Sequence, residues 1–191
     1  MADLAVVGSI ADLAHHHNTR IANVLMDVEH LIVVDCSGSM DAHDARDGER
    51  TRFEAACAEL RKLQRQYQGK IAVIGFSDEV QFSPGGLPEP MHGGTDLTAA
   101  LEYIQDFDGT GVTFDVISDG IPDDQTSALA VAQRLTTRIN TIYIGPTHGE
   151  DWVKQAMAFM KRLAAVSGGA SVVNSASDIG SAVTRLLEAK R

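Results

Sequence analysis

Residues 31–40 read LIVVDCSGSM, and this stretch decides how the rest of the chain is interpreted. Four apolar residues lead directly into Asp35, which is followed by Ser37, Gly38 and Ser39. A short, continuous, β-branched run is typical of a strand buried on both faces, as in a parallel sheet. The polar residues that end it have two interpretations. They form a turn in which Asp35 or a serine caps a helix, or they supply three oxygens that converge on a hard cation.

The composition is ordinary for a soluble globular protein of one domain. The chain has 191 residues, of which 44% are hydrophobic and 22% charged, and its net charge is −10. The acidic balance disfavours nucleic-acid binding through phosphate contacts and docking on an anionic membrane. No stretch approaches the ~20 apolar residues of a membrane span, and no basic leader with an apolar core opens the chain. We therefore expect a cytoplasmic protein in which Cys36 and Cys57 are reduced.

Predicted strands and helices alternate from residue 30 to the end of the chain. Apolar runs predict strands at 30–34, 71–76, 112–118, 139–144 and 170–173, and amphipathic stretches between them predict helices. This alternation predicts an α/β fold with a Rossmann-like, doubly wound, mostly parallel sheet and helices on both faces. The run EVQF at 79–82 follows the strand at 71–76 after a two-residue turn, so we expect it to form an antiparallel edge strand.

The sequence also predicts where several helices begin or end. Thr51 and Glu54 form a capping box that opens the first helix after the glycine-containing polar loop, and Gly69 closes that helix. Trp152 is expected in the core on the stripe of a later helix. A terminal helix is predicted from the apolar stripe Ile179, Val183, Leu186 and Leu187.

The N-terminal segment is predicted to be a helical extension. Apolar residues between Ile10 and Met26 recur with loose helical spacing, so we expect one helix there and divide the chain into residues 1–28 and 29–191. Three adjacent histidines at 15–17 point to different faces of such a helix and make a poor metal site.

Three polar clusters are placed where ligands bind in doubly wound sheets, beyond the carboxyl ends of the strands. Asp35, Ser37 and Ser39 follow the first strand, Thr95 follows the glycine pair 93–94 and opens a helix, and Asp119 follows the strand at 112–118. Two carboxylates and three hydroxyls make an all-oxygen donor set that suits Mg²⁺, Mn²⁺ or Ca²⁺. Two carboxylates neutralise a divalent ion only in part if they act through water, so the ion would favour an anionic ligand from outside.

These residues resemble the metal-ion-dependent adhesion site of von Willebrand factor A domains. The resemblance rests on Asp35-x-Ser37-x-Ser39, Thr95 after a glycine pair, and Asp119-Gly120, and it covers roughly residues 30–190. It implies a six-stranded sheet and a metal contacted by Ser37, Ser39 and often Thr95, with Asp35 and Asp119 acting directly or through water. It also implies that an Asp or Glu of a protein partner completes the coordination, and that the chain is not an enzyme. The lack of a leader makes it more similar to stand-alone prokaryotic members, some of which work with AAA+ ATPases.

Other interpretations of these residues remain open at this stage. Ser39 and Thr95 could simply cap helices, with the aspartates as turn residues. The acidic loop at 41–50 is more often solvated than a second cation site, because its spacing does not fit an EF-hand. A Mg²⁺-dependent phosphatase is the alternative function, since an apolar strand ending in Asp35 resembles the nucleophile strand of haloacid-dehalogenase folds. Such enzymes need a second aspartate as acid or base where this chain has Ser37.

Overall fold

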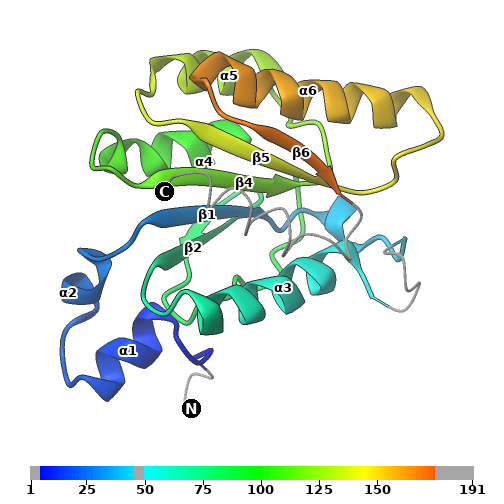
Figure 1. The fold of residues 1–191 in the computed structure, drawn as a ribbon. Helices are drawn as coiled ribbons and strands as arrows, with labels where there is room; N and C mark the ends of the chain where they lie inside the picture. Colours follow the sequence, from blue (N-terminus) through cyan, green and yellow to red (C-terminus); the bar gives the residue numbers. More distant parts are fainter. Residues whose placement is uncertain (1–4, 45–49, 175–191) are drawn as a thin grey trace.

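The computed structural model describes residues 5–44 and 50–174 of the chain. Helices and strands alternate through the described part, and a six-stranded sheet forms its centre (Figure 1). The helices are α1 (Ile10–His16), α2 (Ile21–Leu25), α3 (Arg52–Gln66), α4 (Leu97–Tyr103), α5 (Gln125–Arg134) and α6 (Asp151–Ser167), with short 3-10 turns η1 (Gly38–Asp41) and η2 (Ile104–Phe107). The strands are β1 (His30–Asp35), β2 (Ile71–Phe76), β3 (Val80–Phe82), β4 (Thr113–Ser118), β5 (Ile139–Ile144) and β6 (Ser171–Asn174).

The sheet has the predicted doubly wound topology. The strand order is β3-β2-β1-β4-β5-β6, and all neighbours are parallel except β2 and β3. The strand order reverses between β1 and β4, which are direct neighbours in the register Val34 opposite Ile117. A reversal of this kind opens a crevice at the carboxyl ends of the two strands, and ligands bind there in open α/β sheets. The predicted fold class and the antiparallel edge strand are confirmed.

The four central strands β1, β2, β4 and β5 bury both of their faces, which explains the unalternating apolar run in β1. Leu31 and Val33 join a core shared with α4, α5 and α6, whereas Ile32 and Val34 pack in a second core with α3. Figure 1 shows the same division, with α3 on one side of the sheet and α4, α5 and α6 on the other. Full burial of one such aliphatic side chain contributes roughly 1.5–3 kcal/mol, so the two cores hold β1 firmly in place.

Helix α3 begins at the predicted capping box. The Thr51 hydroxyl accepts a hydrogen bond from the Glu54 amide at 3.0 Å, and the Glu54 carboxylate accepts one from the Thr51 amide at 2.9 Å. These two bonds satisfy amides that the first helical turn leaves free. The first residue of the helix is therefore Arg52, whose side chain is buried.

The N-terminal segment differs from the prediction of one helix between Ile10 and Met26. It forms two short helices, α1 and α2, because Asn18 between them has a left-handed backbone with φ 48°. The segment is tied to the rest of the molecule by backbone bonds, from the Val6 amide to the Gly85 carbonyl and from the Gly69 amide to the Gly8 carbonyl. The division of the chain between residues 28 and 29 stays a prediction.

Trp152 was predicted to lie in the core, and this was wrong. It is 40% exposed, whereas Val153, Ala156 and Met160 form the inward face of α6. Trp152 has the helical spacing of the buried Ala156, but it lies in the first turn of α6, next to the exposed residues 147–150. The predicted terminal helix lies outside the described residues, and none of the helices that are described is long and apolar enough to cross a membrane.

Candidate metal site

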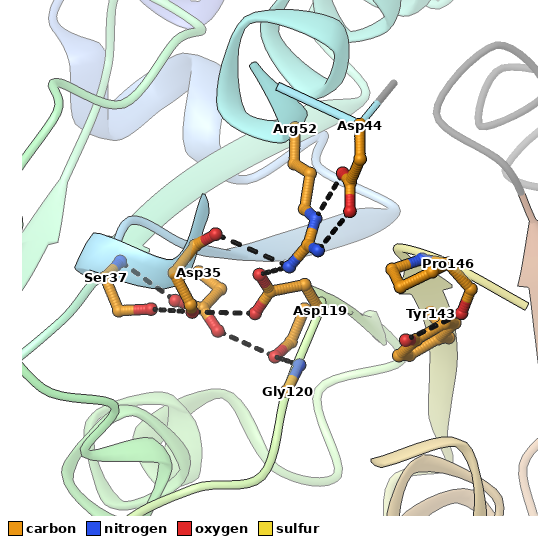
Figure 2. Close-up of polar contacts among 10 residues, drawn as sticks. Asp35, Ser37, Asp44, Arg52, Asp119, Gly120, Tyr143 and Pro146 are labelled. Atoms are coloured by element: carbon orange, nitrogen blue, oxygen red, sulfur yellow. Dashed lines mark hydrogen bonds and ion pairs between the residues drawn. The ribbon is translucent and has the colours of Figure 1, made fainter. Parts of the chain in front are cut away.

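The loops that follow β1 and β4 meet at the edge of the sheet where the strand order reverses. Asp35 is the last residue of β1, and Asp119 directly follows the last residue of β4. Ser37 and Ser39 lie on the turn that leaves β1 and enters η1. Close packing of the two parallel strands therefore places two carboxylates and two hydroxyls together (Figure 2).

Asp35 is fully buried, and both of its carboxylate oxygens accept hydrogen bonds. Oδ1 accepts from the Ser37 amide at 2.9 Å, and Oδ2 accepts from the Ser118 hydroxyl at 2.7 Å. The first bond closes the turn after β1, and the second joins the ends of β1 and β4. Asp35 thus holds the turn in shape and supplies negative charge beneath the two serines.

The three remaining side chains form a short chain of contacts. The hydroxyls of Ser37 and Ser39 lie 3.0 Å apart, and the Ser39 hydroxyl donates to Asp119 Oδ1 at 2.9 Å. Ser39 and Asp119 are 80 positions apart in sequence, so this contact depends on the tertiary structure. The expectation that separate loops bring these oxygens to one edge of the sheet agrees with this geometry.

Thr95 is on a third loop that approaches the same edge. Its amide donates to the carboxylate of Asp123 at 2.9 Å, and the Gly94 amide donates to Asp78 at 2.9 Å. The loop is also tied to the turn after β1, because the Gly38 amide donates to the Gly93 carbonyl at 3.2 Å. Within the described residues, the Thr95 hydroxyl makes no hydrogen bond to the other four candidate side chains. The structure thus brings four candidates into one chain of contacts and places the fifth on a neighbouring loop.

Asp96 directly follows Thr95 on this loop. Asp96 caps α4, because its carboxylate accepts from the Ala99 amide at 2.9 Å. Because this carboxylate satisfies an amide at the start of the helix, we assign Asp96 a structural role in this loop.

Sequence reasoning missed two residues of the site, Arg52 and Ser118. The guanidinium of Arg52 donates to Asp119 Oδ2 and also to the carboxylate of Asp44, and all three groups are drawn in Figure 2. Asp44 belongs to the acidic loop that was interpreted as solvated. The only sequence signal for this contact is a cation directly after a helix cap, which by itself does not separate a buried arginine from an exposed one.

The charge of Asp119 affects the ionisation of the buried Asp35 carboxyl group. Burial, followed by the charge of Asp119, raises the pKa of Asp35 to about 6, although hydrogen bonds from Ser118 and Ser37 lower it. A raised pKa means that the ionised carboxylate is short of positive charge in this environment. A bound cation would supply that charge and favour the ionised form.

The donors present fit a hard divalent cation. Carboxylate and hydroxyl oxygens are the ligands that Mg²⁺, Mn²⁺ and Ca²⁺ accept. The thiol of Cys36, between Asp35 and Ser37 in sequence, packs in the core and is 3% exposed. No group of three or more His, Cys, Asp or Glu side chains suited to a metal occurs in the part of the chain that the structure describes. The candidate site has only two carboxylates, so any cation would depend on the serine hydroxyls and on ligands from outside the chain.

Comparison with known proteins supports the fold but finds no sequence relative. No protein-family model matches the chain, and no curated protein matches it. Among solved structures, the conserved hypothetical protein BatB from Bacteroides thetaiotaomicron superposes with a TM-score of 0.61 and 18% identity, over 86% of this chain and 100% of that one. Proximal thread matrix protein 1 from the mussel byssus gives 0.60 and 15%, over 84% of this chain and 46% of the other.

A third structure carries the name that the motif predicts. The von Willebrand factor type A protein from Catenulispora acidiphila superposes with a TM-score of 0.55 and 18% identity, over 83% of this chain and 41% of that one. The chain therefore spans the whole of the first similar structure and less than half of the other two. At these identities the likeness concerns the fold: this chain has the fold of a von Willebrand factor A domain.

Proposed function

We propose that the chain is a divalent-cation-dependent protein-interaction module. Asp35, Ser37, Ser39, Thr95 and Asp119 would hold the cation, with Mg²⁺ the first choice and Mn²⁺ or Ca²⁺ as alternatives, and an Asp or Glu of a partner protein would complete the coordination. The observation that carries the proposal is the contact chain from Ser37 through Ser39 to Asp119 at 3.0 Å and 2.9 Å.

The contacts of the two carboxylates favour an acidic partner. Asp35 is held by Ser37 and Ser118, and one oxygen of Asp119 is held by Arg52. Their negative charge is thus partly compensated within the protein. A cation coordinated by neutral hydroxyls beside such carboxylates keeps much of its own positive charge, and an anionic ligand from a partner would then bind strongly.

The same contacts count against the phosphatase alternative. A nucleophilic carboxylate must reach a substrate phosphorus atom, whereas Asp35 has 0% exposure and both of its oxygens are engaged. The position two residues later is Ser37, which lacks the acid or base function of a second aspartate. No observation favours an enzyme over an interaction module.

Titration calorimetry with MgCl₂ and MnCl₂ tests the cation half of the proposal. We expect one binding event in the unaltered chain and its loss in Ser39→Ala, which removes a hydroxyl at the centre of the contact chain. Ser127→Ala is the matched control, because Ser127 is a half-buried residue near the start of α5 whose hydroxyl donates to the carboxylate of Asp124. Equal binding heats in the unaltered chain and Ser39→Ala would refute the proposed site.

Affinity capture with and without a chelator tests the partner half. We expect a partner that is retained in Mg²⁺ and released by chelation, and that is lost when one of its own acidic residues is changed to the amide. A partner from an AAA+ ATPase system remains a prediction from the family resemblance, which the same capture experiment would test. A cytoplasmic location also remains a prediction.

A further inference from the structure

Arg52 places a permanent positive charge beside the candidate metal site. Its side chain is 6% exposed and lies between the carboxylates of Asp119, which is 1% exposed, and Asp44, which is 37% exposed. Arg52 Nε donates to Asp44 Oδ1 at 2.7 Å, and Nη1 also approaches the Ser39 carbonyl at 3.4 Å. A guanidinium keeps its charge at any pH that a folded protein tolerates.

The contact of Arg52 with Asp119 involves the carboxylate oxygen that does not accept from the Ser39 hydroxyl. Asp119 Oδ1 accepts from the Ser39 hydroxyl. Oδ2 of the same carboxylate accepts from Arg52 (Figure 2). A cation coordinated at the serines would approach the Oδ1 side of this carboxylate. Arg52 and the cation would then share one carboxylate and repel each other across it.

We propose that Arg52 is a built-in counter-cation that stabilises the site in the absence of metal and limits its affinity for divalent ions. This inference rests on the proposed function, because it concerns regulation of the same site. When no divalent ion is bound, Arg52 offsets the charge of the buried Asp119, which would otherwise be costly to keep in the fold. When an ion binds, it has to tolerate the guanidinium as a like-charged neighbour.

Asp44 has the opposite influence in this arrangement. Its carboxylate offsets part of the Arg52 charge from the solvent side. Removing that carboxylate leaves the guanidinium less compensated, and cation binding should weaken. Removing the Arg52 charge should therefore strengthen cation binding, and removing the Asp44 charge should weaken it. Simple damage to the site would weaken binding in both variants.

The test is the dissociation constant for Mn²⁺ and Mg²⁺, measured by titration calorimetry on the full chain. We expect Arg52→Gln to bind about tenfold more tightly than the unaltered chain, equivalent to about 1.4 kcal/mol, and Asp44→Asn to bind about threefold more weakly, since its side chain is partly screened by solvent. Arg52→Lys keeps the charge and should stay within about threefold of the unaltered chain. Arg61→Gln is the matched control, an exposed charge on the same helix, and should change nothing.

Thermal unfolding provides a second measurement that does not depend on calorimetric heats. In the presence of a chelator, Arg52→Gln should melt at a lower temperature than the unaltered chain, because Asp119 loses its counter-charge. Saturating Mg²⁺ should then raise its melting temperature by more than it raises that of the unaltered chain. If Arg52→Gln does not fold, Asp44→Asn decides the question by itself.

The outcomes separate this inference from the proposed function. Binding by the unaltered chain, together with unchanged or weaker binding by Arg52→Gln, overturns the inference alone. Unchanged or tighter binding by Asp44→Asn overturns it as well. An absence of divalent binding in the unaltered chain and in every variant overturns the proposed function, and this inference with it.

Discussion

Replacing Asp35 by asparagine should make the metal-free protein more stable at neutral pH. Asp35 is fully buried, and its pKa is raised from 3.8 to about 6, first by burial and then by the charge of Asp119. One pKa unit corresponds to about 1.4 kcal/mol, so ionising Asp35 in the fold costs up to about 3 kcal/mol at pH 7. Asparagine has the same shape and can still accept from the Ser37 amide, but it carries no charge.

The sign of the pH dependence follows from the raised pKa. Below pH 3.8 the carboxyl group of Asp35 is protonated in both the folded and the unfolded chain, and it resembles the amide that replaces it. Between pH 3.8 and about 6 the unfolded chain releases this proton first, so the stability contributed by Asp35 is lost as the pH rises through that window. The difference in unfolding free energy between Asp35→Asn and the unaltered chain should therefore be near zero at about pH 3.8 and reach its maximum above about pH 6.

Urea unfolding at a series of pH values in the presence of a chelator measures this difference. Saturating Mg²⁺ should then make the unaltered chain the more stable of the two proteins. An ion at a hundred times its dissociation constant stabilises the unaltered chain by about 2.7 kcal/mol, and it cannot do so for a variant that lacks the Asp35 carboxylate. Asp115→Asn is a useful comparison, since Asp115 is also fully buried but lies within β4, away from the candidate site. If Asp35→Asn is less stable than the unaltered chain by the same amount at pH 4 and pH 7, charge repulsion at Asp35 is not the cause and the reasoning is refuted.

The remaining predictions concern the loop before α4 and the buried thiol beside the site. Gly94→Ala should weaken Mg²⁺ binding in calorimetry, because an added Cβ would lie 2.6 Å from Asp78 and 2.7 Å from Asp123, whose carboxylate accepts from the Thr95 amide. Gly120→Ala is the control and should bind Mg²⁺ normally, because no atom lies within 4 Å of its added Cβ. Equal affinities in the two variants would contradict this prediction. Cys36 should react slowly with a thiol reagent at pH 8 in the folded chain and rapidly in urea, because burial and then the charge of Asp35 raise the pKa of its thiol to about 12. Fast labelling of the native protein would show that the Cys36 side chain does not face the core.

Much of the fold followed from local patterns. The unalternating strands predicted a parallel sheet with both faces covered, and the capping box at Thr51 and Glu54 placed the start of α3 correctly. The EVQF run predicted the antiparallel edge, which the pairing of β2 and β3 confirms. These successes share a cause, because each depends on the period of apolar residues or on contacts between residues a few positions apart.

The errors arose where local signals are weak or ambiguous. The loose apolar spacing between Ile10 and Met26 suited one helix or two, and the left-handed backbone at Asn18 separates them. Trp152 was placed in the core because it has the helical spacing of Ala156 and Met160, yet it is 40% exposed in the first turn of α6. Helical spacing predicts which face of a helix is buried, and only the packing of neighbouring elements decides how far along the helix that burial extends.

For the candidate site, the sequence by itself determined which oxygen donors are available, because their types and their order after successive strands are given directly by the residues. The tertiary structure decided which of those donors touch: Ser39 reaches Asp119 across 80 positions, whereas Thr95 remains on a neighbouring loop. It alone revealed that Arg52 pairs with Asp119, a contact across 67 positions. The physical reason is that a turn or a cap depends on neighbours along the chain, whereas the balance of charge at a buried site depends on every group that the fold brings near it, at whatever distance in sequence.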